Sequence, residues 1–247
     1  GDKLHVKFIG AGAYPVANAD TININVLNLK AQATMFDDFC GGLATTGNIG
    51  NLGWSLSNTG STFDAGQTGY ATTSAPCWFQ IQNNAGGANN RGQIFLATQT
   101  AMVMGGNVRL TARIKLAEVS AGTIFRFGFY DLTSSAVSYP TDGLFVEANI
   151  DSSTNWRLVS SNASTRTFDN SATAVTTSIT TIDIVTNSGY TQADMYINGV
   201  LTTGSITTNL PGSTAEGSIH FVEQTKDTST RTVGIDFFSY SLTGISR

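Results

Sequence analysis

Acidic side chains are the first candidates for chemistry in this sequence. Glycoside cleavage needs an acid and a nucleophile or base on one side of a cleft. Glu147 and Asp151 are four residues apart, with turn residues between them. The two histidines, His5 and His220, are far apart, and the sequence has no G-x-S-x-G or H-E-x-x-H motif. We find no set of residues suited to catalysis and expect a protein that is not an enzyme.

Aromatic side chains beside turns are the second candidates, because their flat rings can stack on sugar rings. Trp156 and Arg157 follow a turn that ends at Asn155, and Trp54 follows a glycine-rich loop. Together with Tyr139, they form our predicted glycan-binding set. The alternative for the tryptophans is packing in the core, where such large rings are commonly buried.

Three aspartates are candidates for a calcium site. Asp37 and Asp38 precede the glycine-rich loop, and Asp236 lies in the last predicted strand. Calcium takes oxygen ligands, often carboxylates in loops. If the first and last strands pair, the three carboxylates could approach each other, and calcium is the one cofactor that the sequence suggests. Solvated surface aspartates or local Asx turns are the alternative.

Composition excludes several partners. Only 12% of the 247 residues are charged, against about 25% in ordinary domains. The net charge is -4, and the lysines and arginines are scattered, so we expect no nucleic-acid partner. No run of 18 apolar residues occurs, and we expect no membrane span. Cys40 and Cys77 fit either one disulfide or two buried thiols.

These candidates must be positioned by β-strands. Runs rich in apolar and β-branched residues alternate with turn signals, and helical periodicity is almost absent. The residues 109–116 and 124–129 alternate as half-buried strands of antiparallel sheets do. Asn198-Gly199 predicts a hairpin with a type I′ turn. The predicted strands are Trp78–Gln82, Gly92–Thr98, Asn107–Leu116, Thr123–Tyr130, Leu144–Ile150, Trp156–Ser160, Thr181–Thr186, Ala193–Ile197, Ser218–Val222 and Val233–Leu242. The pattern is typical of an all-β sandwich or barrel.

The first part of the chain differs from the rest. Residues 1–35 contain one alternating run, Thr21–Val26, and we predict an extended N-terminal arm or docking segment. The alternative is that this segment adds a strand or two to the main domain. Residues 36–247 show no linker and no repeat, and we predict that they form one sandwich domain.

The order of strands and motifs from 36 to 247 resembles the concanavalin A-like (laminin-G or pentraxin-like) jelly-roll domain. The resemblance is carried by Asp37-Asp38-Phe39, Trp54, the strands at Arg109–Leu116 and Thr123–Asp131, Asn155-Trp156-Arg157-Leu158, Asp194–Gly199 and Val233–Phe238. It implies an antiparallel two-sheet jelly-roll sandwich. The three alternating carboxylates, E-x-D-x-E, that laminarinase-like jelly-roll enzymes carry on one strand are absent.

The low-charge, Thr-, Ser- and Asn-rich form of this domain resembles those of bacteriophage virion proteins. The resemblance implies a non-enzymatic structural protein on the virion surface, as a capsid decoration, head fibre or tail fibre, that can bind glycans. Its implied partners are sister subunits in a homotrimer, other virion proteins and a cell-surface glycan. The alternatives are a secreted carbohydrate-binding module and a glycan-cleaving jelly-roll enzyme.

Overall fold

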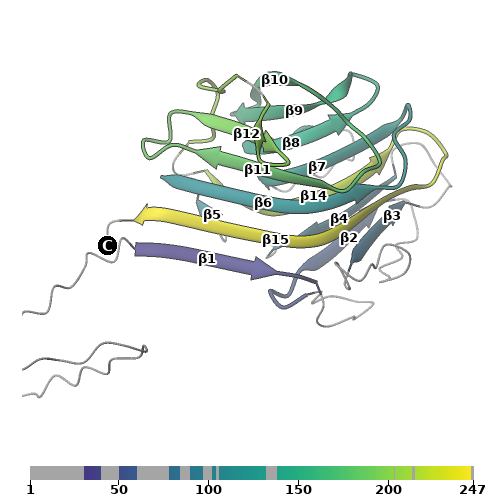
Figure 1. Ribbon diagram of the computed structural model, residues 1–247, viewed down its shortest axis with the longest axis horizontal. Coiled ribbons are helices and arrows are strands. Elements are labelled where there is room, and N and C mark those ends of the chain that lie inside the picture. The colour runs from purple at the N-terminus through teal and green to yellow at the C-terminus, as the bar shows by residue number, and fades with distance from the viewer. Residues whose placement is uncertain are drawn as a thin grey trace, which may run out of the picture.

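The protein is a sandwich of two antiparallel β-sheets (Figure 1). The computed structural model describes residues 31–39, 50–59, 78–83, 90–96, 102–103, 106–131, 138–202, 204–212 and 215–245. The seven-stranded sheet has the order β1 (Ala31–Asp37), β15 (Arg231–Ile245), β6 (Asn107–Leu116), β11 (Thr180–Thr186), β12 (Ala193–Ile197) and β13 (Val200–Leu201), and β3 (Phe79–Asn83) also pairs with β15. The eight-stranded sheet has the order β10 (Thr165–Ala174), β9 (Ser153–Asn162), β8 (Gly143–Asn149), β7 (Thr123–Tyr130), β14 (Glu216–Thr225), β4 (Arg91–Phe95) and β2 (Ser55–Thr59), and β5 (Met102–Val103) also pairs with β14. The predicted all-β sandwich is confirmed.

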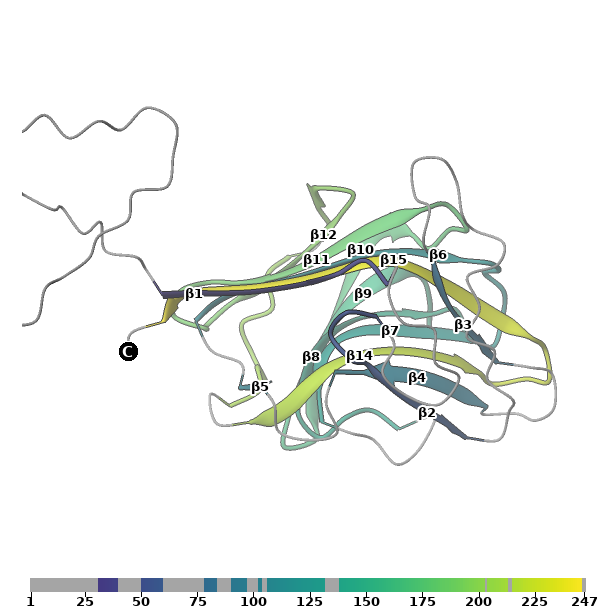
Figure 2. The ribbon, with the colours of Figure 1, turned by 90° about the horizontal axis from the view of Figure 1, so that it is seen from below.

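The two sheets form separate layers with the core between them (Figure 2). Apolar side chains enter the core from alternate positions of each strand, because successive side chains of a strand point to opposite faces. On β6 these residues include Leu110 and Ile114, and on β7 they are Phe125, Phe127 and Phe129. Across the described residues, the regular elements are all strands, and none is a helix that could span a membrane.

Local sequence signals located several strands closely. β6, β7 and β12 have the predicted bounds. At the predicted hairpin, Asn198 and Gly199 have φ values of 53° and 79°, as a type I′ turn requires. The Asn198 side-chain oxygen also accepts a 2.8 Å hydrogen bond from the Thr181 N–H of the neighbouring strand. The hairpin prediction is therefore confirmed, and its turn is also tied to the sheet.

The prediction that β7 is half-buried was wrong. All eight of its residues are buried, and so are all seven of β8. Arg126 points away from the core and is nevertheless only 3% exposed. Its charge is matched by a carboxylate on β8, which the β7 sequence alone does not reveal. The eight-stranded sheet therefore has a second buried layer on the face opposite the core.

Strand β10 was not predicted, because its turn lacks the usual residues. β9 and β10 are joined by Ala163 and Ser164, which have positive φ values of 47° and 68°. These conformations normally favour Asn and Gly. Here the turn is held from outside, since the Ala163 N–H donates to Asp142 and the Ser164 N–H donates to the Thr141 carbonyl. A contact distant in sequence thus replaces the local signal.

The division between arm and sandwich stays a prediction for most of its length. β1 begins at Ala31 and pairs with β15, so the last five residues assigned to the arm lie in the seven-stranded sheet. The Thr21–Val26 run lies outside the described residues, as do Cys40 and Cys77.

Asp37 closes the chain segment that follows β1. Its side chain is fully buried and accepts hydrogen bonds from the backbone N–H groups of Phe39 and Leu52, each at 2.8 Å. It also accepts one from the Trp54 indole at 3.0 Å. Gly50 packs so closely against this carboxylate that a Cβ atom there would collide with it. One carboxylate therefore joins the end of β1 to the segment that precedes β2.

We predict that Asp37→Ala destabilises the fold strongly. Three N–H donors lose their acceptor in or near the core, and an unsatisfied buried donor costs about 1–3 kcal/mol. The expected loss is about 3 kcal/mol or more of unfolding free energy, measured by urea denaturation. Asp38→Ala is the matched control, because the bond of Asp38 to Asn51 is exposed to solvent. Equal losses in the two variants would contradict this role for Asp37.

Candidate functional site

The face of the eight-stranded sheet that points away from the core carries a row of charged side chains. We call it the outer face. Cross-strand pairing places Arg126 of β7 opposite Glu147 of β8, and Glu147 opposite Arg157 of β9. Directly paired residues of neighbouring strands project from the same face. The register itself therefore builds an Arg–Glu–Arg row across three adjacent strands.

Both oxygens of the Glu147 carboxylate are occupied. Arg126 Nε donates to Oε1 at 2.9 Å, and Arg157 Nη2 contacts Oε2. The Tyr139 hydroxyl donates to Oε2 at 3.1 Å and accepts a hydrogen bond from Arg157 at 3.1 Å. All three charged side chains are almost completely removed from solvent. A carboxylate held in this way acts as the counter-charge of two guanidinium groups.

Two aromatic rings extend this row toward solvent. The Arg126 guanidinium lies 4.5 Å from the centre of the Tyr139 ring, and that of Arg166 lies 4.7 Å from the same ring. The Arg157 guanidinium lies 5.0 Å from the ring centre of Phe168. The ring centres of Phe168 and Tyr139 are 5.6 Å apart, and the two rings meet edge to face. We call the six residues the arginine–aromatic cluster: Arg126, Tyr139, Glu147, Arg157, Arg166 and Phe168.

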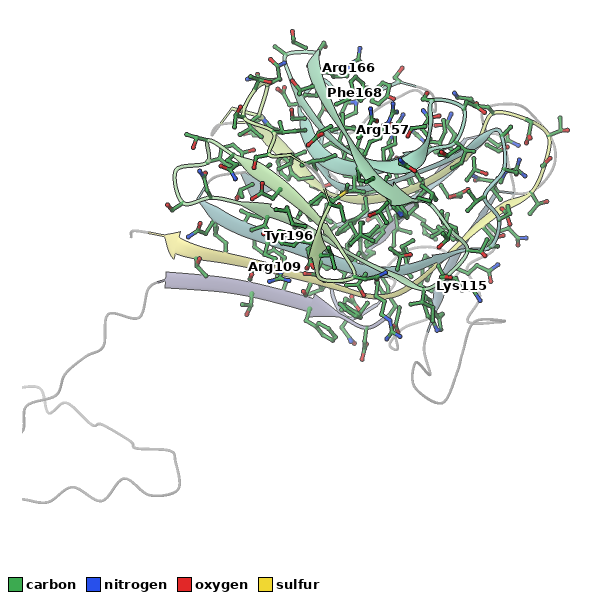
Figure 3. The ribbon with its side chains drawn as sticks, turned by 45° about the horizontal axis from the view of Figure 1, so that its top comes forward. Arg109, Lys115, Arg157, Arg166, Phe168 and Tyr196 are labelled. Atoms are coloured by element: carbon green, nitrogen blue, oxygen red, sulfur yellow. The ribbon has the colours of Figure 1, made fainter. Side chains whose placement is uncertain are left out.

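The cluster reaches the surface at β10. Phe168 is 42% exposed, and Arg166 is exposed beside it. Figure 3 shows both side chains on β10 with Arg157 nearby, while Arg109 and Tyr196 lie on the seven-stranded sheet. Arg166, stacked on Tyr139, and the partly exposed Phe168 ring form a platform that can hold a flat ligand with polar groups at its edge. This exposed end is the candidate site.

The other half of the outer face is buried and rich in polar atoms. His220 of β14 stacks between Phe95 and Tyr130, with ring centres 5.6 and 4.2 Å away. Burial, followed by the nearby charge of Arg91, lowers the pKa of His220 to about 3, so its imidazole is neutral at neutral pH. His220 points away from the core, as its strand position predicts, but it is 1% exposed and not a surface residue. It has no access to an exposed ligand.

Two of the four predicted glycan-binding residues meet in the cluster. Arg157 and Tyr139 are hydrogen-bonded to each other, although they are 18 residues apart. The two tryptophans are in the core. Trp54 packs edge to face against Phe238, with ring centres 5.2 Å apart, and Trp156 packs in the same way against Phe125, with ring centres 6.2 Å apart. The structure therefore places both indole rings away from any ligand-binding surface.

The three predicted calcium ligands do not point to one place. β1 and β15 do pair, as the calcium hypothesis required. However, Asp37 lies opposite Phe238, a core residue, whereas Asp236 forms a 2.9 Å ion pair with Arg113 on the outer side of the sheet. Asp38 is near enough to contribute to the raised pKa of Asp236, which is mainly caused by burial. In the part of the chain that is described, no three acidic, histidine or cysteine side chains are grouped so that they could hold a metal.

Comparison with known proteins identifies the fold. No protein-family profile matches the chain, and no curated protein matches it. Solved structures do. The carbohydrate recognition domain of Emp47p is 10% identical, with a TM-score of 0.56, over 86% of this chain and 95% of that one. The β-glucanase of Bacillus licheniformis is 12% identical, with a TM-score of 0.55, over 84% and 97%. A carbohydrate esterase from the Shiga toxin-encoding bacteriophage phi24B is 12% identical, with a TM-score of 0.50, over 76% and 90%.

The chain has the concanavalin A-like jelly-roll fold. At these identities the likeness establishes the fold alone. The matches include a carbohydrate recognition domain, a β-glucanase and a carbohydrate esterase, so the fold is shared by binding domains and enzymes.

Sequence reasoning missed Arg126, Arg166 and Phe168. Glu147 was considered only with Asp151, which lies in an exposed turn and binds the Gly122 N–H and Lys226. β10 has one large apolar residue, Phe168, among polar and small ones, so alternation did not mark it as a strand, and the turn before it lacks Asn and Gly. Without β10, nothing placed an arginine and an aromatic ring beside Arg157.

We predict that Glu147→Gln destabilises the concanavalin A-like domain. The substitution keeps the side-chain shape but leaves two buried guanidinium groups without a counter-charge. Breaking a buried ion pair in this way typically costs about 3–5 kcal/mol. Urea denaturation of the wild type, of this variant and of Asp151→Asn tests the prediction. The exposed Asp151 variant should lose far less, and an undiminished midpoint for Glu147→Gln would show that the row does not stabilise the fold.

The neutral, buried His220 predicts a specific loss of stability in acid. An unfolded histidine has a pKa of about 6.5. Because the folded pKa is lower, the unfolded state gains a proton first as the pH falls from about 6.5 toward 3. This lowers the unfolding free energy by up to about 1.4 kcal/mol for each pH unit. His220→Phe removes the effect and keeps a ring between Phe95 and Tyr130. As the pH falls from about 6.5 to about 4, the unfolding free energy of the variant should therefore rise relative to that of the wild type, as measured by urea titrations at each pH. Parallel curves of unfolding free energy against pH would contradict the prediction.

Proposed function

We propose that this protein is a non-enzymatic glycan-binding protein displayed on the surface of a bacteriophage particle. The observation that carries the binding role is the exposed end of the arginine–aromatic cluster. Phe168 offers an apolar ring to solvent, and Arg166 offers hydrogen-bond donors beside it. Sugars present both an apolar ring face and polar edges, so they match this pair. The rings of Tyr139 and Phe168 pack edge to face, with their centres 5.6 Å apart.

The arrangement on β8 supports binding without cleavage. Alternate residues of a strand share a face, and β8 presents Phe145, Glu147 and Asn149 outward. Only one of these three positions is a carboxylate, and its oxygens are bonded to Arg126, Arg157 and Tyr139. Glycosidases use two carboxylates, one to donate a proton and one as nucleophile or base. Among the described residues, Glu147 is the one carboxylate that pairs with the arginines of the cluster.

The virion location is supported by composition and by resemblance. The chain is poor in charge and rich in Thr, Ser, Gly and Asn, as the phage proteins that it resembles are. A phage-borne display protein would bind a cell-surface glycan, with sister subunits in a homotrimer and other virion proteins as its partners. The N-terminal segment would provide the docking contact. Mass spectrometry of purified particles and immunogold microscopy test the location. Absence from particles combined with retained glycan binding would favour a secreted carbohydrate-binding module.

We predict that Phe168→Ala weakens glycan binding by about tenfold or more, as loss of a central aromatic contact commonly does. Binding is measured on a glycan array and then by calorimetry on the best ligand. Phe36→Ala is the matched control, because Phe36 is also an exposed phenylalanine, at 57%, but lies on β1 of the other sheet. Wild type should release no reducing sugar and no ester-linked acid from the bound glycan. Turnover would contradict the non-enzymatic proposal, and equal effects of the two variants would contradict the site.

A further inference from the structure

The charge of the arginine–aromatic cluster is opposite to that of the whole protein. The chain has a formal net charge of -4. The cluster contains three guanidinium groups, on Arg126, Arg157 and Arg166, and one carboxylate, on Glu147. Three positive charges and one negative charge leave +2. Concentrated positive charge on an acidic protein attracts anions to that place and not to the rest of the surface.

Arg166 is the part of this charge that a ligand can reach. Arg126 and Arg157 are buried and share Glu147, whereas Arg166 is exposed and stacks on Tyr139. Among the described residues, Arg166 forms no ion pair. Exposed or half-buried arginines elsewhere differ, since Arg109 pairs with Asp183 and Arg113 pairs with Asp236. The stacked ring orients the Arg166 guanidinium but does not neutralise it.

The neighbours of Arg166 define the shape of a suitable ligand. Arg166 pairs with Ser161 across the β9–β10 register, and Phe168 pairs with Val159, so both side chains project from the outer face two positions apart. The planar guanidinium presents parallel N–H groups that match a carboxylate or sulfate. The partly exposed Phe168 ring offers an apolar surface next to it. A ligand that fits both has a ring with an anionic substituent at its edge.

We propose that the glycan bound by this protein is acidic, with Arg166 binding its anionic group and Phe168 contacting the adjoining sugar ring. This inference rests on the proposed glycan-binding function and adds the chemical class of the ligand. Arg126 and Arg157 supply the local positive field, and Glu147 keeps the two groups in place. Two sources share the anionic chemistry, namely carboxylated and sulfated sugars.

The test compares acidic and neutral glycans on the full chain. The probes are polygalacturonate, its methyl ester, dextran sulfate and dextran, together with a glycan array that contains acidic and neutral members. Polygalacturonate and its methyl ester form one matched pair, because esterification removes the charge and keeps the backbone. Dextran sulfate and dextran form the second matched pair. We expect binding to at least one class of acidic glycan. The binding should weaken from about 0.05 M to about 0.5 M NaCl, because salt screens exposed charges.

Arg166→Gln is the decisive variant. Loss of a charge-assisted contact should weaken acidic-glycan binding by about tenfold or more. Arg109→Gln is the control, since it removes the same charge from an exposed side chain of the other sheet. Thermal melting checks that both variants are folded. Arg166→Lys keeps the charge but loses the planar fork, and it should bind with intermediate affinity.

Each outcome separates the two proposals. Acidic-glycan binding that Arg166→Gln weakens and Arg109→Gln does not supports this inference. Binding of neutral glycans that depends on Phe168 and is unchanged by Arg166→Gln overturns the acidic class but leaves the proposed function standing. Binding of acidic glycans that both arginine variants weaken equally indicates general charge attraction and also overturns the inference. Absence of binding to every glycan overturns both.

Discussion

A carboxylate buried between two guanidinium groups must keep both partners, because a buried charge without a partner is strongly destabilising. Arg126, Glu147 and Arg157 meet this requirement through the register of β7, β8 and β9. A shift of one residue in either pairing would turn every side chain of that strand to the opposite face. It would move the charges into the apolar core and bring core residues such as Val146 outward. The ionic row and the apolar core therefore both require the same register, and each stabilises the strand pairing on which the other depends.

The same row of charges also positions the exposed side chains at the edge of the outer face. Glu147 accepts a hydrogen bond from the Tyr139 hydroxyl, and the Tyr139 ring stacks on the guanidinium of Arg166, which lies on the edge strand β10. Among the described strands, β10 pairs with β9 alone, and the Arg157 guanidinium of β9 lies over the Phe168 ring of β10. Arg126 and Arg157 both pair with Glu147, whereas Arg166 is exposed and stacks on Tyr139. The buried charges thus hold the exposed pair, Arg166 and Phe168, in a defined geometry at the edge of the domain.

Sequence reasoning predicted the features that depend on neighbouring residues. Alternation gave β6 and β7, and Asn198-Gly199 gave the hairpin, because strand faces and type I′ turns are local properties. It did not predict features that depend on distant contacts. The Ala163-Ser164 turn relies on residues 141 and 142, and the burial of Arg126 relies on a carboxylate of the next strand. The burial of Trp54 and Trp156, two of the four residues in the predicted glycan-binding set, was missed for the same reason, since it follows from the stacking of two sheets.

The chemistry of the outer face is set by a few outward positions of adjacent strands. Solved structures with this fold include a carbohydrate recognition domain, a β-glucanase and a carbohydrate esterase, so the architecture sets no preference between binding and cleavage. On β8 of this chain, the outward positions beside Glu147 are an aromatic residue and an amide, Phe145 and Asn149. Arg126 and Arg157 carry two positive charges and Glu147 carries one negative charge, so the buried row keeps a net positive charge. On β8 the acid Glu147 anchors Arg126 and Arg157, and the arginine-rich end of the outer face follows from that pairing.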